Sequence, residues 1–344
     1  ALLTGGMRAK ARRELLLNLE LGLVDVVVGT HALLEEDVRF ANLSLTVTDE
    51  QHRFGVEQRA RLSNKSENAP DVLVMTATPI PRTLALTVYG DLDISVMKGR
   101  PPQRKPVRTL CYTDERRREV YAGLVRQVQA GRQAYVVCPL IEESDVLAVH
   151  SAERVYEELK RDFLQDIPCA LLHGRLKGAE KDAIMSSFAA GELKVLVSTT
   201  VIEVGVNVPN ATLMVIENAE RFGLAQLHQL RGRVGRGSEQ SYCVLLTAAD
   251  SPEALARLNV LHESEDGFYL AEKDMEQRGA GQLFGLKQHG LPDLRIADIM
   301  RDVDVIAQVR RLAQAQLRTP EDWAEIRRLV EMQFGERFNM IFNT

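Results

Sequence analysis

Short apolar runs alternate with amphipathic stretches along most of the chain, a pattern typical of strands and helices that alternate around a parallel sheet. In the N-terminal part, three runs rich in β-branched residues predict buried strands: Val24–Val28, Leu43–Thr48 and Val72–Met75. The neighbouring stretches predict helices at Arg8–Leu21, Phe54–Leu62 and Pro81–Tyr89. Three strands make a small sheet, so we expect this lobe to be truncated on its N-terminal side.

A second and fuller series follows Gly99–Pro106, a proline-rich basic segment that we interpret as an extended linker. Six strands are predicted at Val107–Tyr112, Ala134–Leu140, Ala170–His173, Val195–Ser198, Leu213–Glu217 and Tyr242–Thr247. Helices are predicted between them at Glu115–Ala130, Ala152–Phe163, Gly178–Ala189 and Leu224–Gly232. Beyond about Ser251 only helical periodicity remains. The pattern therefore predicts an α/β protein with a first lobe at residues 1–98, a linker at 99–106, a second lobe at 107–250 and a helical region at 251–344.

Composition narrows the class of protein. Of the 344 residues, 45% are hydrophobic and 26% charged, as in an ordinary globular protein. The sequence has no apolar run long enough to span a membrane, and its first residues lack the layout of a signal peptide. The four cysteines are far apart and form no C-x-x-C pair, so we expect reduced thiols in the cytoplasm and no metal site built from cysteine.

Charge limits how the chain could bind nucleic acid. The net charge is −5, so any contact with DNA must come from local basic stretches. Two such stretches occur, Met7–Arg13 and Arg100–Arg108. Each is either a contact surface for phosphate groups or a solvated face of the fold.

An Asp-Glu pair, Asp49-Glu50, directly follows the predicted strand Leu43–Thr48. In phosphoryl transfer one carboxylate holds Mg²⁺, usually through water, and a second orients or deprotonates the attacking water. We assign the first role to Asp49 and the second to Glu50. The pattern G-x-x-x-x-G-K-[ST], whose backbone cradles phosphates, does not occur in the sequence. The chain is therefore expected to hold half of a nucleotide-hydrolysis site.

Other polar segments also lie at the ends of predicted strands. Thr76-Ala77-Thr78 could relay hydrogen bonds from a nucleotide site, or form a simple turn closed by Pro79. Ser198–Asn207 lies at the carboxyl end of a strand, where ligands bind in open α/β sheets. Thr30-His31 and His173-Gly174-Arg175 are either contacts for a phosphate backbone or structural turns.

The densest signal is the segment Gln229–Gly237, which reads QLRGRVGRG. Its glycines allow sharp turns of the backbone, and its arginines present planar, permanently charged groups that suit a phosphate. Because the segment lies inside an ordered α/β series, we exclude a disordered glycine–arginine tract.

These motifs together resemble the superfamily 2 helicases, in which a DExH box, a TAT motif and a Q-x-x-G-R-x-G-R motif occur in this order. Over residues 4–310 the chain resembles the RecG family of ATP-dependent DNA translocases. The resemblance is carried by TDEQHRFGVEQR (48–59), TATPIPRTLALTVYGDLDISV (76–96), GLAQLHQLRGRVGRG (223–237) and DMEQRGAGQLFGLKQHG (274–290). It implies two RecA-like parallel-sheet lobes and a helical region with a translocation element, and identifies the chain as a C-terminal portion of such a protein.

The resemblance implies a role for each matching residue, with ATP and Mg²⁺ as cofactors. The expected catalytic residues are Glu50, Arg233, Arg236 and Asp49, which holds Mg²⁺. The residues expected to bind ATP are Gly205, Asn207 and Gln229, and those expected to couple the lobes are Gln51, His52, Thr76 and Thr78. DNA binding and translocation are expected of Thr30, Arg278, Gly279, Gly281 and Gln288. Asn207 stands where the family usually has aspartate.

The implied function is a DNA helicase that moves on double-stranded DNA and remodels stalled forks and Holliday junctions in recombination and repair. The expected partner is branched DNA, with single-stranded-DNA-binding protein as a further one, and the expected state is a cytoplasmic monomer without membrane contact. Two alternatives remain, a translocase like the transcription-repair coupling factor and a non-catalytic DNA- or partner-binding fragment. We expect the chain itself not to hydrolyse ATP, because it has no phosphate-binding loop and no lysine from such a loop.

Overall fold

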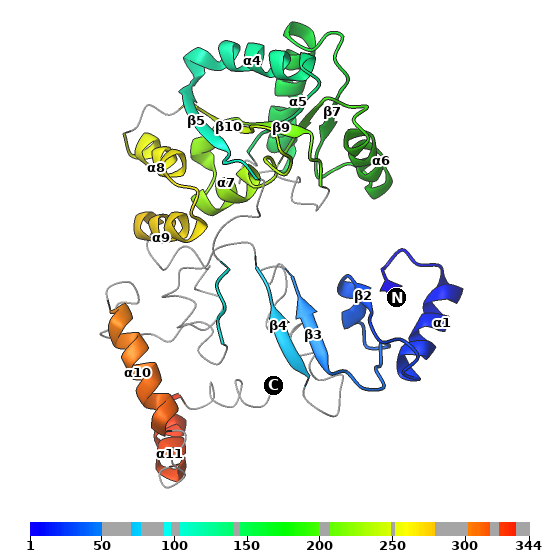
Figure 1. Cartoon of the computed structure of the whole chain (residues 1–344), viewed down its shortest axis with the longest axis vertical. Helices are drawn as coiled ribbons and strands as arrows, with labels where there is room; N and C mark the ends of the chain where they lie inside the picture. Colours follow the sequence, from blue (N-terminus) through cyan, green and yellow to red (C-terminus); the bar gives the residue numbers. More distant parts are fainter. Residues whose placement is uncertain are drawn as a thin grey trace. The chain divides into compact units, whose positions relative to one another are not determined.

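The computed structural model describes residues 1–49, 70–76, 93–97, 104–139, 145–199, 207–248, 252–278, 302–316 and 323–334 (Figure 1). The chain divides into two compact units. The smaller is formed by residues 1–78 and 308–344, and the larger by residues 79–307. The four-part division expected from the sequence stays a prediction.

The larger unit is built on a six-stranded parallel sheet with the strand order β5-β10-β9-β6-β8-β7. Its strands are β5 (Arg108–Thr113), β6 (Gln133–Val137), β7 (Cys169–Leu172), β8 (Val195–Ser198), β9 (Ala211–Ile216) and β10 (Tyr242–Thr247). All six were predicted from the apolar runs, because strands buried on both faces are apolar along their whole length. Since every strand runs in the same direction, their carboxyl ends meet at one edge of the sheet.

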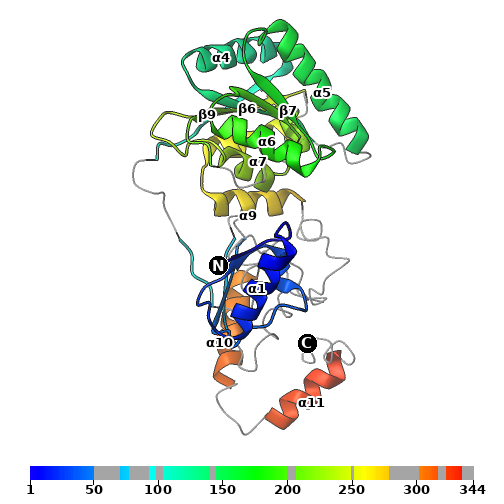
Figure 2. The ribbon, with the colours of Figure 1, turned by 90° about the vertical axis from the view of Figure 1, so that its right-hand side faces the viewer.

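Successive side chains of these strands point into two separate cores. Tyr135 and Met214 pack on one face of the sheet, and their neighbours Val136 and Val215 pack on the other. Helices α6 (Gly178–Ala189) and α7 (Leu224–Arg231) cover the first face, and α4 (Arg117–Gln129) and α5 (Asp145–Asp162) cover the second (Figures 1 and 2). A fully buried side chain such as that of Phe188 stabilises the fold by about 2–3 kcal/mol.

Two further helices, α8 (Pro252–Glu263) and α9 (Gly267–Arg278), pack against α7. Leu258, Leu261 and Leu270 join the core on that side of the sheet. The turn between the helices is closed locally, because the Asp266 carboxylate accepts a hydrogen bond of 2.9 Å from the Phe268 amide. The first part of the predicted helical region is therefore packed onto the second lobe.

The smaller unit contains two separate two-stranded parallel sheets among its described strands, β1 (Leu2–Leu3) with β2 (Val28–Gly29) and β3 (Leu45–Thr48) with β4 (Asp71–Val74). Helix α1 (Ala9–Glu20) and the 3-10 turn η1 (His31–Leu34) cover the first sheet. Leu3, Leu15 and Leu19 form the centre of its core. Helix α11 (Trp323–Phe334) belongs to this unit, and α10 (Val303–Gln316) crosses the boundary between the units.

The structure differs from the sequence predictions in two elements of this unit. The strand predicted at Val24–Val28 is only the short β2, since Asp25 interrupts it with a bend. The two-residue strand β1 was not predicted. The predicted helices Phe54–Leu62 and Pro81–Tyr89 lie outside the described residues.

No helix in the described part of the chain is long and apolar enough to cross a membrane.

Candidate functional site

In the smaller unit, polar residues follow two paired strands. Thr48 of β3 lies opposite Val74 of β4, and the Met75 amide donates a 2.8 Å hydrogen bond to the Thr48 carbonyl oxygen. Asp49 and Thr76 therefore follow neighbouring strands at the same end of their sheet, as one site would require. The other four predicted members of this group, Glu50, Gln51, His52 and Thr78, lie outside the described residues.

The described residues contain no group of three or more His, Cys, Asp or Glu side chains that could hold a metal ion. A single exposed carboxylate such as Asp49 suits Mg²⁺ held largely through water. The Mg²⁺ role of Asp49 therefore stays a prediction.

Thr30 lies at the corresponding end of the other small sheet. Its amide donates a 3.3 Å hydrogen bond to the Leu3 carbonyl oxygen, so it lies beside the end of β1. The residue is exposed, which leaves its predicted contact with DNA sterically open.

In the larger unit, the arginine-rich segment extends from a firmly buried helix. Leu224, Leu227 and Leu230 fix α7 in the core, while Gln229, Arg233 and Arg236 are only half-buried. These three predicted site residues therefore lie close together at the end of α7. Apolar packing along α7 fixes the helix from which they extend.

Positive charges gather around Arg236. Burial and the nearby charges of Arg233 and Arg104 lower the pKa of Arg236. Burial also raises the pKa of Tyr135 on β6 to about 12, although Arg236 and Arg233 favour its ionised form. Like charges at partly buried positions repel each other unless an anion neutralises them. This cluster of Arg104, Arg233 and Arg236 therefore suits a phosphate group.

Two glycines give the segment its path. Gly235 has a φ of +76°, and a Cβ added to it would lie 2.6 Å from Val107 Cγ2. A Cβ on Gly237 would lie 2.7 Å from the Pro209 carbonyl oxygen. The end of the arginine-rich segment therefore lies against Pro209, two residues after Asn207, which is exposed. Gly205 lies outside the described residues.

At the carboxyl ends of β7 and β8, three buried polar atoms have no hydrogen-bond partner among the described residues: His173 Nδ1, Ser198 Oγ and Thr199 Oγ1. The two strands are paired, with Leu172 opposite Ser198, so the three residues lie at the same end of neighbouring strands. Buried polar atoms are normally paired, and this edge is where parallel sheets bind ligands. Both segments were singled out from the sequence.

Arg231, the first arginine of the QLRGRVGRG segment, has an internal role that the sequence did not predict. Its side chain is 3% exposed, and its guanidinium donates to the carbonyl oxygens of Leu261 (2.8 Å) and Ser264 (3.0 Å) and to Thr109 Oγ1 (3.3 Å). A further contact of 3.0 Å joins it to Nδ1 of His228. Arg231 thus ties α7 to the end of α8 and to β5.

The opposite end of α7 is held by α9. The buried Asp274 carboxylate accepts a 3.2 Å hydrogen bond from the Leu224 amide, the first of α7. Arg257 of α8 donates to the Glu220 carbonyl oxygen, just before α7. A carboxylate at a helix N-terminus satisfies a free amide and complements the helix dipole. No local motif predicts these contacts, because the partners are far apart in sequence.

A second buried polar network lies at the carboxyl end of β9. The Glu217 carboxylate accepts hydrogen bonds from Tyr121 and from Arg117 (3.2 Å), and Arg117 also donates to Glu158 (2.7 Å). Burial raises the pKa of Glu217, and the charge of Arg117 opposes this shift. The network links α4, α5 and β9, and none of its members was predicted as a site residue.

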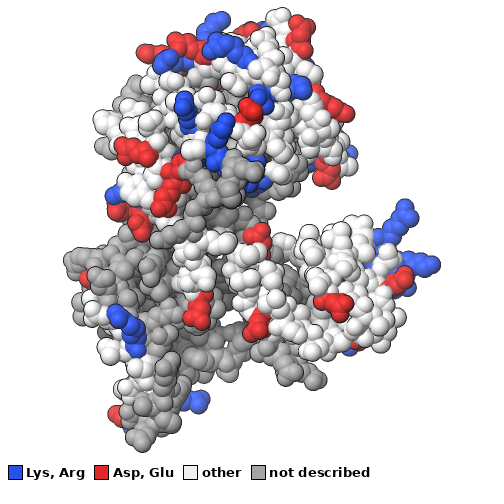
Figure 3. All heavy atoms as spheres, in the orientation of Figure 1, with Lys and Arg blue, Asp and Glu red and all other residues white. Residues whose placement is uncertain are grey.

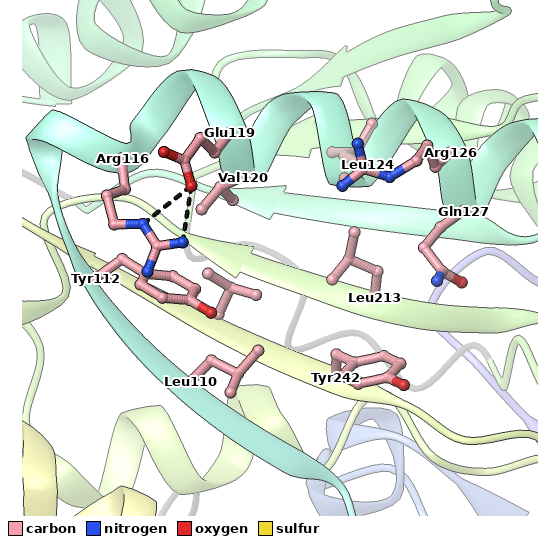
Figure 4. A pocket seen from close by; sticks show the side chains of 12 residues that line it. Leu110, Tyr112, Arg116, Glu119, Val120, Leu124, Arg126, Gln127, Leu213 and Tyr242 are labelled. Carbon is pink, nitrogen blue, oxygen red and sulfur yellow. Dashed lines mark hydrogen bonds and ion pairs between the residues drawn. The ribbon is translucent and has the colours of Figure 1, made fainter.

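A cavity of about 310 Å³ opens on the α4 side of the sheet (Figure 4). Tyr112, Tyr242 and Leu213 line its apolar wall, and Arg116, paired with Glu119, lies at its rim. None of the predicted site residues lines this cavity.

The predicted translocation residues are only partly described. Arg278 is the last residue of α9, and Gly279, Gly281 and Gln288 lie outside the described residues.

Comparisons with known proteins agree with the motif order. Residues 1–87 match the DEAD/DEAH box helicase family, residues 116–238 the helicase conserved C-terminal domain, and residues 264–333 domain 3, C-terminal, of ATP-dependent DNA helicase RecG.

Relatives of similar sequence include the ATP-dependent DNA helicase RecG of Bacillus subtilis. It is 50% identical over 325 residues, which are 94% of this chain and 48% of the relative. The RecG of Escherichia coli strain K12 is 52% identical over 317 residues, 91% of this chain and 46% of the relative. The chain thus spans about half the length of the curated relatives it matches.

A solved structure of RecG bound to a three-way DNA junction is similar to this one, with a TM-score of 0.69 and 46% identity, covering 89% of this chain and 39% of that chain. A solved structure of the Mycobacterium smegmatis helicase Lhr is also similar, with a TM-score of 0.55 and 17% identity. The match covers 77% of this chain and 37% of that chain, and it supports the fold alone. The predicted fold, a parallel-sheet α/β protein of the RecA-like helicase type with helices in its C-terminal part, is confirmed. With its helicase motifs in order and its similarity to RecG over most of its length, the chain belongs to the RecG family of helicases.

Proposed function

We propose that the protein is an ATP-dependent DNA helicase that translocates on double-stranded DNA and remodels branched DNA, such as stalled forks and Holliday junctions, in recombination and repair. The observation that carries this proposal is the cluster of Arg104 with the half-buried Arg233 and Arg236 beside the end of α7, where burial and the neighbouring charges lower the pKa of Arg236. A cluster of this kind is ready to accept the phosphates of a nucleotide. The RecG relatives are ATP-dependent DNA helicases by name, and one is solved on a three-way DNA junction.

In the proposed site, each predicted residue has its own chemical role. Glu50 would orient the attacking water, and Arg233 and Arg236 would neutralise the charge that develops on the transferred phosphoryl group. Gln229, Gly205 and Asn207 would position the nucleotide. Mg²⁺, held near Asp49 through water, would supply electrostatic stabilisation of the phosphates.

DNA would be held through its phosphates at the sheet edges, and we include Thr30 in this contact. Gln51, His52, Thr76 and Thr78 would couple hydrolysis to DNA movement, and Arg278, Gly279, Gly281 and Gln288 would serve translocation. We further propose a cytoplasmic monomer whose partners are branched DNA and single-stranded-DNA-binding protein. The coupling-factor alternative is not favoured, because the relatives reported above are RecG proteins.

For the chain as it stands, we propose DNA binding without ATP hydrolysis, since its sequence has no phosphate-binding loop. The test measures ATP turnover by this 344-residue chain with and without a three-way junction. We expect no turnover above background. Turnover that Glu50→Gln abolishes would refute the half-site proposal.

The arginine assignment needs a complete site. In a RecG-family protein that carries these residues together with a phosphate-binding loop, Arg236→Ala should remove junction-stimulated turnover while leaving junction binding intact. The loss of one transition-state donor typically costs about 10²–10³ in kcat. Unchanged turnover would overturn the role of Arg236, and a loss of junction binding would place this arginine on DNA.

A further inference from the structure

The N-terminal end of helix α1, in the smaller unit, is basic. Residues 8–13 include Arg8, Lys10, Arg12 and Arg13 and no acidic residue. The helix is held in the fold through Leu15 and Leu19 in its second half, whereas the side chains of residues 8–11 are all exposed. Lys and Arg side chains project from the part of the surface formed by α1 (Figure 3).

Among the described residues, Arg12 alone of these four cations forms ion pairs. The Arg12 guanidinium pairs with both Glu35 and Asp37, one of its hydrogen bonds to Asp37 measuring 2.9 Å, and so ties α1 to the segment after η1. Arg8, Lys10 and Arg13 make no ion pair with any described residue. Their charges are therefore available to a partner.

The position of these charges lowers the stability of helix α1. α1 has no acidic residue in its first turn and no side-chain cap on its free amides. Cations near a helix N-terminus oppose the helix dipole, which favours anions there. Residues that break a local rule of stability without any gain in packing mark functional sites. The basic start of α1 therefore requires an explanation from outside the fold.

Lys10 and Arg13 lie three positions apart, so they share one side of the helix. Helical spacing places this side opposite Leu15, away from the core. Both side chains of this side are exposed. Two long flexible cations on one side of a helix suit the regularly spaced phosphates of a nucleic-acid backbone.

We propose that this basic face of α1, formed by Lys10 and Arg13, binds the phosphate backbone of duplex DNA. The inference rests on the proposed function, in that it assigns a contact for the DNA on which the helicase acts. Such a contact carries no sequence information and contributes to affinity in a strongly salt-dependent way.

The test compares the chain with its Lys10→Gln/Arg13→Gln double variant, by fluorescence anisotropy on a labelled duplex over a range of salt concentrations. Each phosphate contact contributes about 0.9 to the slope of log K against log salt, so the slope should fall by about two. From the same slope, affinity near 0.1 M salt should fall roughly 50-fold. The matched control is Arg154→Gln/Lys160→Gln, which removes the same charge from exposed positions on α5.

Thermal unfolding separates the contact from a folding defect. Removing cations from the start of α1 relieves their conflict with the helix dipole, so the melting temperature of the double variant should stay the same or rise. Weaker DNA binding together with an unchanged or higher melting temperature supports the proposal.

Each other outcome has a definite meaning. Suppose that the chain binds duplex DNA, but the α1 variant keeps the salt slope of the unmodified chain or loses no more affinity than the α5 control. The α1 contact is then refuted while the proposed function stands. If the loss appears with single-stranded but not duplex DNA, the duplex assignment is overturned. If the unmodified chain binds neither a duplex nor a junction at low salt, DNA binding by this chain fails and the inference fails with it.

Discussion

Replacement of Arg231 by methionine tests whether α7, α8 and α9 act as one packed block. Methionine has a similar length and can fill the apolar part of the space, but it donates no hydrogen bond. The change leaves two main-chain acceptors, the buried carbonyl oxygen of Leu261 and the half-buried one of Ser264, without their donor. Each such group costs about 1–3 kcal/mol, and the avoided burial of a charge offsets part of this. We expect a net destabilisation of about 3 kcal/mol.

Hydrogen exchange measured by mass spectrometry locates this loss. Since about 1.4 kcal/mol corresponds to a factor of ten, amides of α8 and α9 should exchange roughly 100-fold faster in the variant. Amides of β6 and β9 in the sheet centre should change much less. Amides of α1 in the smaller unit serve as an internal reference.

The conservative variant Arg231→Lys sharpens the interpretation. Lysine keeps the charge but not the planar fork that reaches several acceptors together, so it should restore only part of the protection. Exchange of α8 and α9 in Arg231→Met within twofold of the unmodified chain would refute the anchoring role of Arg231.

Three further predictions concern the same part of the molecule. Gly235→Ala should destabilise the larger unit by about 2 kcal/mol in denaturant unfolding, because its φ is positive and its new Cβ would clash with Val107. Asp274→Ala should cost about 1 kcal/mol in the same assay by uncapping α7, and Asp274→Asn less than half of that. Burial and the charge of Arg231 lower the pKa of His228 to about 4 from an ordinary 6.5. The unfolded chain therefore binds the proton first, and stability should fall by up to about 3 kcal/mol as pH decreases from about 6.5 to about 4, a dependence that His228→Gln should flatten.

Each of these predictions has its own contrary result. Gly131 has a φ of +86° and open space around it, so Gly131→Ala measures the backbone strain alone, and an equal loss at Gly235 would disprove the clash. Equal stability of the Asp274 alanine and asparagine variants would show that the side-chain oxygen of residue 274 does not stabilise the start of α7. A His228→Gln variant with the same acid sensitivity as the unmodified chain would assign that sensitivity to other groups.

The six-stranded sheet could be predicted from the sequence because its strands are apolar on both faces and are separated by clear helical periodicity. The start of α5 was misplaced. The helix was predicted from Ala152, yet it begins at Asp145, seven residues earlier. The two-residue strand β1 has too short a pattern to be seen.

The candidate site was predictable only as far as its residues are contiguous in sequence. The motif QLRGRVGRG pointed to Arg233 and Arg236, but it does not separate them from Arg231, whose acceptor Leu261 is 30 residues away. The Asp274 cap lies 50 residues from the helix it serves. Arg104, which lies near Arg236, belongs to the segment that was interpreted as a linker. Long-range hydrogen bonds and charge clusters depend on tertiary packing, which no local pattern encodes.

The hydrogen bonds that join α7 to α8 and α9 also determine where the second lobe can be cut for separate study. The alternation of strands and helices ends near residue 250, and a truncation there would look natural in the sequence. Such a piece would lack the carbonyl acceptors of Arg231 and the carboxylate that caps α7, while still exposing the apolar face that Leu258, Leu261 and Leu270 cover. A self-sufficient lobe should therefore extend at least to the end of α9, at Arg278.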